Sequence, residues 1–253
     1  MNWPIYTCAA MKRHSIRHND QFIDYEITHR PAVTRRIHLE IDEAGELKVV
    51  APKRMSRRAI QKTLQQRASH VARFLVRARS RQQDLVEFRY VSAERHLFMG
   101  QSYPLEIREQ GGKRSSVVLS DGQILMKVPE LTEERVRRTL ANWYRQRAQQ
   151  LFSARLDFYS QAATWTGGQA PPMRLRLMKR TWGSCSSKGM ITLNPHLVKA
   201  PPECIDYVIA HEICHLKEHN HGKSFYALQE QLYPAWRASK TRLHNNGHIY
   251  LHM

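Results

Sequence analysis

The chain has 253 residues, 42% of them hydrophobic, and its 40 Lys and Arg against 22 Asp and Glu give a formal net charge of +18 at pH 7. This length allows one large domain or two small ones with a substantial buried core. No stretch approaches the ~20 apolar residues of a membrane span, and the amino-terminal residues do not show the basic and then apolar segments of a secretory signal. No Cys-x-x-Cys pair occurs. We therefore expect a cytoplasmic, reduced protein without membrane contact.

The positive charge is concentrated in the middle of the chain. Residues 51–200 contain 28 basic and 10 acidic residues, whereas residues 1–50 contain 7 of each and residues 201–253 contain 5 of each. A field of this sign attracts polyanions. Nucleic acid and nucleotides are therefore candidate partners of the 51–200 region, and a solvated surface without a dedicated ligand is the alternative interpretation.

Three segments between residues 20 and 52 alternate apolar and polar side chains, which predicts strands, and segment 42–46 with its glycine predicts a turn. A helix is predicted from its N-cap, Ser56, to about Gln83, with apolar residues on one face. Its other face is basic and lacks interleaved aromatic residues, so it can lie along a phosphate backbone or in solvent but does not indicate base stacking. The strand segments are 22–27, 37–41 and 47–50, the apolar positions are Ile60, Leu64, Val71 and Leu75, and the basic positions are Arg57, Arg58, Lys62, Arg73, Arg77 and Arg81.

A second group of strands follows, and Thr132 then caps a long predicted helix. Segment 166–172, which contains glycine and proline pairs, predicts a loop. We therefore expect a basic, β-rich amino-terminal half with two long helices over residues 1–165 and a second part over residues 166–253, and the two can also pack as a single unit. The strand segments are 96–99, 102–108, 115–120 and 123–129, followed by 173–179 and 190–194.

Segment 211–215 reads His-Glu-x-x-His and carries the most specific chemistry in the chain. A helix is predicted around it, because a Pro-Pro pair precedes it and apolar residues recur at spacings of three and four. On a helix, His211 and His215 lie on one face about 5–6 Å apart, and two imidazoles in this arrangement can bind one Zn²⁺. Glu212 then lies beside a metal-bound water and can act as a general base.

A third ligand is expected after this helix. If the helix ends near Lys217, the chain can turn back and bring His221 to the other two histidines. His219 and Glu230 remain alternative third ligands. The simpler interpretation is that the histidines after the helix are ordinary polar residues of an exposed turn.

The motif continues as HEICHLKEHNHGKSFY and is preceded by RTWGSCSSKGMITLNPHLVKAPPECIDYVIA. This part of the chain resembles the catalytic core of the YgjP-like metallopeptidases, which are distant relatives of the SprT-like (Spartan) proteases. The family usually has adjacent Arg and Trp residues, whereas Thr181 separates Arg180 from Trp182 here. The likeness extends over roughly residues 20–240 and is most specific between 180 and 226.

This resemblance implies an α+β fold with a zincin-like catalytic core that contains the His-Glu-x-x-His helix, preceded by a β-rich amino-terminal half with long helices. It also implies Zn²⁺ as the cofactor, with His211, His215 and His221 as its ligands and Glu212 as the catalytic base. In zincin-like folds a strand beside the metal helix commonly pairs with extended substrate. Segment 190–194 is the candidate strand, and an ordinary internal strand is the alternative.

Three functions are compatible with these residues. The leading hypothesis is a zinc metallopeptidase that cleaves proteins or peptides, including proteins bound to DNA. The second is a nucleoside triphosphate pyrophosphatase, because YgjP-like proteins are associated with triphosphate hydrolysis, although a histidine-rich site favours zinc over Mg²⁺ and no Gly-rich phosphate loop occurs. The third is a nucleic-acid-binding module with structural zinc, which would not need Glu212.

Candidate donors to an oxyanion are His219, Tyr226 and His244, while Cys185 and Trp182 are assigned no role.

Overall fold

The chain divides into two compact units, residues 1–86 and residues 87–253. Both contain helices and strands, in agreement with the predicted α+β class. No helix within the described residues combines the length and the apolar character needed to cross a bilayer. The computed structural model describes residues 14–19, 21–30, 36–42, 45–83, 88–179 and 181–251.

The first unit contains a four-stranded sheet with the order β1-β2-β4-β3. Strands β2 and β4 are parallel, and the two outer pairs are antiparallel. The predicted turn between the last two strands is present, since the Asp42 carbonyl accepts a hydrogen bond from Gly45 N–H at 3.0 Å. The first strand was not predicted. The strands are β1 (His14–His18), β2 (Gln21–His29), β3 (His38–Ile41) and β4 (Leu47–Ala51).

Two helices follow this sheet, α1 (Arg57–Gln66) and α2 (Ala68–Gln83). Ser56 Oγ accepts a hydrogen bond from Ala59 N–H at 3.3 Å, as predicted for the N-cap. The prediction of one helix as far as residue 83 is wrong at Arg67, whose φ of −117° and ψ of 23° lie outside the helical region. The predicted apolar positions of both helices are buried against the sheet.

The second unit begins with another four-stranded sheet, of order β5-β6-β8-β7. All four strands were predicted to within two residues. The segment between β6 and β7 does not join two paired strands, because β6 pairs in parallel with β8 and β7 lies at the edge. The strands are β5 (Arg95–Phe98), β6 (Gln101–Glu109), β7 (Ser116–Ser120) and β8 (Gln123–Val128).

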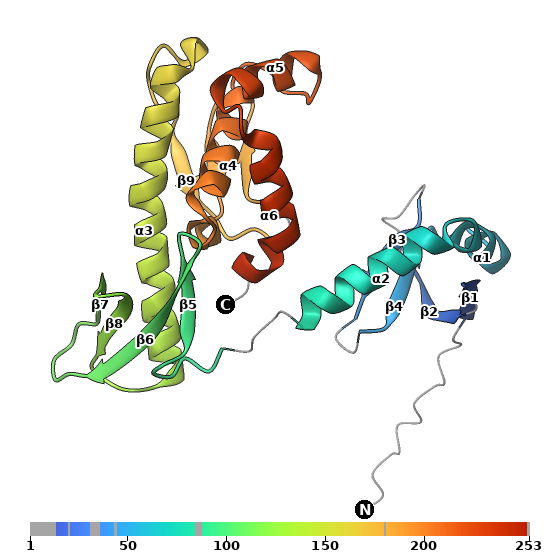
Figure 1. The fold of residues 1–253 in the computed structure, drawn as a ribbon, viewed down its shortest axis with the longest axis horizontal. Helices are drawn as coiled ribbons and strands as arrows, with labels where there is room; N and C mark the ends of the chain where they lie inside the picture. The colour runs from blue at the N-terminus through green and yellow to red at the C-terminus, as the bar shows by residue number, and fades with distance from the viewer. Residues whose placement is uncertain are drawn as a thin grey trace, which may run out of the picture. The chain divides into compact units, whose positions relative to one another are not determined.

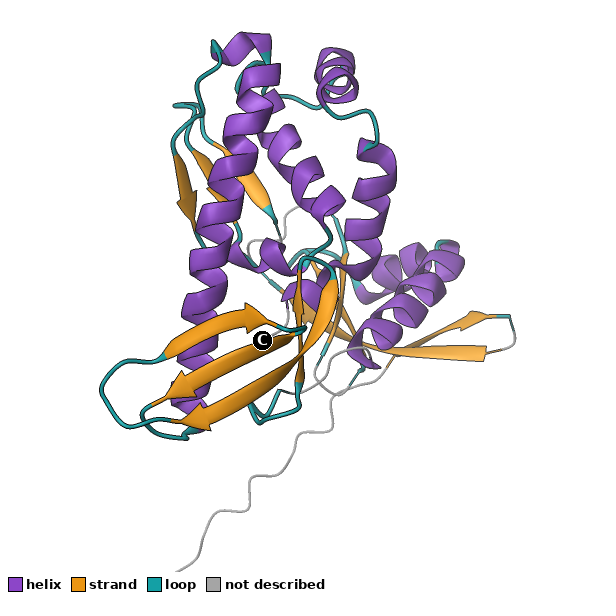
Figure 2. Cartoon of the chain, turned by 60° about the vertical axis from the view of Figure 1, so that its left-hand side comes forward, coloured by secondary structure: helices purple, strands orange, loops and turns teal. Residues whose placement is uncertain are grey.

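A long helix, α3 (Glu133–Ala162), follows this sheet and is capped by Thr132 as predicted. Figures 1 and 2 show α3 beside α4 (Pro202–Cys214), and one hydrophobic core contains residues of both helices and of the second sheet. The chain therefore divides between residues 86 and 87 rather than at the predicted boundary between 165 and 166. Residues 87–165 group with residues 166–253 because α3 buries its apolar stripe against α4.

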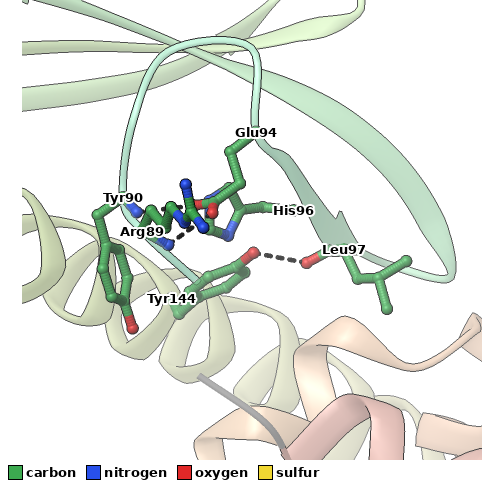
Figure 3. A network of polar contacts seen from close by, with 6 residues as sticks. All are labelled: Arg89, Tyr90, Glu94, His96, Leu97 and Tyr144. Atoms are coloured by element: carbon green, nitrogen blue, oxygen red, sulfur yellow. Dashed lines mark hydrogen bonds and ion pairs between the residues drawn. The ribbon is translucent and has the colours of Figure 1, made fainter. Parts of the chain in front are cut away.

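Polar contacts fix the start of the second sheet (Figure 3). The Glu94 carboxylate accepts hydrogen bonds from the backbone N–H groups of Arg89 at 2.7 Å and Tyr90 at 3.0 Å. In the same region Tyr144 of α3 donates its hydroxyl to the Leu97 carbonyl of β5 at 2.7 Å. The long helix is thus joined to this sheet by a buried hydrogen bond as well as by apolar packing.

A three-stranded sheet of order β10-β11-β9 lies between α3 and α4 in sequence. The prediction that residues 190–194 offer a free edge to substrate is wrong, because β11 is the central strand: β10 pairs with it antiparallel and β9 pairs with it parallel. Strand β10 lies between the two segments that were predicted as strands, and it is an edge strand. The three strands are β9 (Met173–Leu175), β10 (Gly183–Cys185) and β11 (Ile191–Leu193).

The remaining elements surround α4 in sequence: the 3-10 helix η2 (Pro195–Lys199) precedes it, and α5 (Lys223–Leu232) and α6 (Trp236–Leu251) follow. The β5–β6 turn is hydrogen-bonded to η2, since Gly100 N–H donates to the Lys199 carbonyl at 2.9 Å. A Cβ atom on Gly100 would lie 2.8 Å from Pro201 Cγ. This close approach connects the second sheet to the start of α4.

We expect Gly100→Ala to destabilise the second unit more than Gly122→Ala. Both glycines have positive φ, +77° and +73°, but a Cβ on Gly122 meets nothing within 4 Å. The left-handed conformation should cost each variant about 1–2 kcal/mol, and overpacking against Pro201 should add about 1–3 kcal/mol to Gly100→Ala alone. Urea unfolding of both variants measures the difference, and equal losses would contradict the steric role of Gly100.

Candidate metal centre

Helix α4 positions the first two histidines. Its apolar residues are buried against α3 and α6, while His211 and His215 are partly exposed one turn apart. His215 is the C-cap of α4, and its N–H still reaches the His211 carbonyl at 3.3 Å. The helix therefore ends three residues before the predicted Lys217, but the i, i+4 relation of the two imidazoles is kept.

The loop between α4 and α5 brings His221 to these two residues. One ring nitrogen from each of the three histidines lies within 4.8 Å of the others. The Nε2 atoms of His211 and His221 are 3.0 Å apart. Tetrahedral zinc with Zn–N bonds of about 2.0–2.1 Å requires N···N separations of roughly 3.3 Å, so the three side chains fit a zinc ion after small rotations.

Hydrogen bonds orient two of these rings. His211 Nδ1 lies 3.1 Å from Oε1 of Gln229, a fully buried residue of α5. His215 Nδ1 lies 2.9 Å from the Glu218 carbonyl. Since both partners are oxygen acceptors, each Nδ1 carries the proton and each Nε2 keeps a free lone pair, as metal ligation requires.

Burial keeps these imidazoles neutral. It lowers the pKa of His211 to about 4, with His215 and His221 as further causes. Burial also lowers the pKa of His215. Neutral imidazole is the form that binds a metal, so His211 and His215 are ready to bind at neutral pH without losing a proton.

Glu212 follows His211 in α4 and is only 4% exposed. Burial raises the pKa of its carboxyl to about 8. No hydrogen-bond donor among the described residues reaches its Oε2 atom. A cation held by the neighbouring histidines would favour the ionised form, because an opposite charge nearby lowers a carboxyl pKa. This buried oxygen without a protein partner fits a group that exchanges a proton with bound water.

Gly183 of β10 lies directly against this carboxyl. A Cβ atom at residue 183 would be 2.5 Å from Glu212 Oε1. The edge strand and the carboxyl group are therefore in contact only because residue 183 has no side chain. The carboxyl is thereby placed beside the free edge of a sheet.

The two alternative third ligands do not join the histidines. Glu230 Oε2 accepts a hydrogen bond from Trp236 Nε1 at 2.7 Å and forms an ion pair with Arg237. The group of potential metal ligands within the described residues contains His221 but neither Glu230 nor His219. Cys185 also lies outside this group, and Trp182 packs against Gly247 of α6.

The model of the YgjP-like metallopeptidase domain matches residues 35–246. The chain belongs to the YgjP-like metallopeptidase family. This confirms the resemblance seen in the sequence. One similar solved structure is the crystal structure of the metallopeptidase zymogen of Pyrococcus abyssi abylysin, with 27% identity and a TM-score of 0.34, covering 40% of this chain and 98% of that chain. A search of curated proteins found no match.

Three residues of this YgjP-like site were missed in the sequence. Gln229 follows Phe225 by one helical turn, so a polar residue on an apolar face was the available signal. Tyr207 precedes His211 by one turn, and its pKa is raised to about 12 by burial and then by Glu212 and Tyr226. It therefore keeps its proton at neutral pH and can donate a hydrogen bond. Gly183 belongs to the stretch that carries the family resemblance, but nothing in the sequence indicated its contact with Glu212.

We expect His221→Ala to lower zinc affinity and His219→Ala to leave it unchanged. Loss of an outer partner of a zinc ligand costs about 10- to 100-fold in affinity, so loss of a ligand should cost more than about 100-fold. Competition with a chromophoric chelator measures both variants. The ligand assignment fails if His219→Ala shows the larger loss.

Proposed function

We propose that this YgjP-like protein is a zinc-dependent peptidase with a zincin-like centre, in which His211, His215 and His221 hold the metal and Glu212 is the general base. Two observations carry the proposal: three histidines converge on one point, and Glu212, which follows the first of them in α4, has a buried carboxyl oxygen that no donor among the described residues reaches. A purely structural zinc site has no use for such a carboxyl. Proteins or peptides are the proposed substrates.

Each residue has a distinct task in this reaction. His211, His215 and His221 would hold Zn²⁺, which would supply Lewis acidity and lower the pKa of a water molecule there. Glu212 accepts the proton of the attacking water at its Oε2 and delivers it to the leaving amine. Gln229 and the Glu218 carbonyl hold the imidazole rings in the ligating tautomer. The protonated Tyr207 hydroxyl is a donor for the developing oxyanion.

Strand β10 is the proposed binding edge for an extended substrate. It is the outer strand of its sheet, and Gly183 contacts Glu212. A peptide that adds its backbone hydrogen bonds to a free strand edge would pass beside the general base. This assigns to β10 the role that the sequence had suggested for residues 190–194.

Triphosphate hydrolysis is the competing activity. It commonly uses Mg²⁺, which prefers oxygen ligands, whereas the group of potential ligands in the described part of the chain consists of three histidines. The all-nitrogen set favours zinc and therefore peptide hydrolysis. An assay of the purified protein on a denatured protein and, in parallel, on nucleoside triphosphates separates the two activities.

We expect Glu212→Gln to retain zinc and to lose peptidase activity by about 10²- to 10⁴-fold, the usual contribution of a general base. The amide has nearly the same shape as the carboxyl but cannot accept the proton. Metal content and both parallel assays are measured on the same preparation. Full peptidase activity in the variant would remove Glu212 from the mechanism, and loss of triphosphate hydrolysis alone would replace the peptidase proposal.

We expect Gly183→Ala to reduce peptidase activity while leaving zinc content unchanged. The added Cβ must displace the Glu212 carboxyl, and a displacement of about 1 Å at a catalytic group can cost about 100-fold. The control is Gly111→Ala, since a Cβ there meets nothing within 4 Å. Equal activity of the two variants would show that contact with Glu212 is unimportant.

A further inference from the structure

The two four-stranded sheets of this chain follow the same plan. Each has an antiparallel first pair, a parallel central pair and an antiparallel last pair, with identical strand order, and each leads directly into a capped helix. The central pairs also share a register, Tyr25 opposite Leu47 in one and Leu105 opposite Ile124 in the other. When β2 and β6 are aligned by this register, three positions have the same residue in both strands: Gln21 and Gln101, Glu26 and Glu106, and Ile27 and Ile107.

The helices after the sheets correspond in the same way. Both begin at a hydroxyl N-cap, and the residues four and eight positions later are buried in both. A threonine stands seven positions after each cap. One structural unit is therefore present twice, which provides an internal reference for each position. The matched pairs are Ser56 and Thr132, Ile60 and Val136, Thr63 and Thr139, and Leu64 and Leu140.

The two copies have opposite charges at the start of the helix. The first turn of α3 carries Glu133 and Glu134, which suit the positive end of the helix dipole. The corresponding residues of α1 are Arg57 and Arg58, and α1 has no acidic residue in its first turn. Cations at this end of a helix oppose the dipole, so these arginines do not serve the stability of α1.

The cations around α1 are also not neutralised within the described residues. Residues 51–83 contain ten Lys and Arg and no Asp or Glu. Two carboxylates of the first sheet are already paired, Glu40 with Arg30 at 3.0 Å and Asp42 with Lys48 at 3.2 Å. We call the following five exposed cations, none of which forms an ion pair in the described structure, the α1 basic surface: Lys53, Arg54, Arg57, Arg58 and Lys62.

We propose that the α1 basic surface binds the phosphate backbone of double-stranded nucleic acid. Arg58 and Lys62 are one helical turn apart and share a face, as expected for contacts that follow a phosphate row. Residues 53–66 contain no aromatic residue that could stack on unpaired bases, which favours a duplex over a single strand. The apolar residues of α1, Ile60 and Leu64, are buried in its own unit and leave no apolar face for a lipid surface. This binding does not depend on the reaction at the metal centre.

The test measures fluorescence anisotropy of a labelled DNA duplex of mixed sequence with the full chain. Five phosphate contacts predict that affinity falls by more than about 100-fold between about 50 and 200 mM salt. The variant Arg57→Glu/Arg58→Glu installs the charges of the second copy. We expect at least a 10-fold loss of duplex binding with an unchanged or higher melting temperature, because the new charges suit the helix dipole.

The matched control is Lys113→Glu/Arg114→Glu, which makes the same change in net charge at two exposed residues of the second unit. It should bind the duplex almost as well as the unchanged chain. Equal losses in the two double variants would overturn the proposal, since they would reflect net charge alone. Stronger binding to single-stranded DNA of the same length, or binding only to vesicles of anionic phospholipid, would also overturn it.

Discussion

The proposed chemistry depends on a carboxyl group that is buried among apolar atoms. Burial raises the pKa of the Glu212 carboxyl to about 8, and a cation held by the histidines would lower it again and favour the ionised form that accepts a proton. The same burial keeps the adjacent His211 neutral, with its pKa lowered to about 4. Gly183 allows the neighbouring strand to approach without displacing the carboxyl. Base strength, metal affinity and access for an extended chain therefore depend on one small set of contacts.

These contacts require that α4 be held in place, and α3 and the segment that follows it support both ends of α4. Asp206, in the first half of α4, forms an ion pair with Arg155 of α3. Near the other end of α4, Trp165 Nε1 donates to the Ile213 carbonyl at 3.0 Å and satisfies a backbone acceptor of the last turn. With apolar packing between these points, the helix that carries both histidines is fixed at each end. Such rigidity is what a preorganised site needs.

The two copies of the duplicated sheet-and-helix unit differ in what their helices do. In the second copy the helix lengthens into α3 and buries its apolar stripe in the core that also contains α4. In the first copy α1 ends at Gln66, and its exposed side is basic. The repeat is difficult to see in the sequence because strands and helices conserve an alternation of apolar and polar residues more than the residues themselves. Strand order and register revealed it.

The sequence by itself determined the features that depend on residues close together in the chain. The strands of the second sheet, the caps at Ser56 and Thr132, and the family followed from periodicity and motif, and the His-Glu-x-x-His spacing brought two imidazoles to one helix face. Only the tertiary structure decided the central position of β11, the pairing of β6 with β8, and the partner role of Gln229. It also decided where the chain divides, because α3 packs on α4. These features arise between residues far apart in the chain, and local periodicity contains no information about which distant surfaces meet.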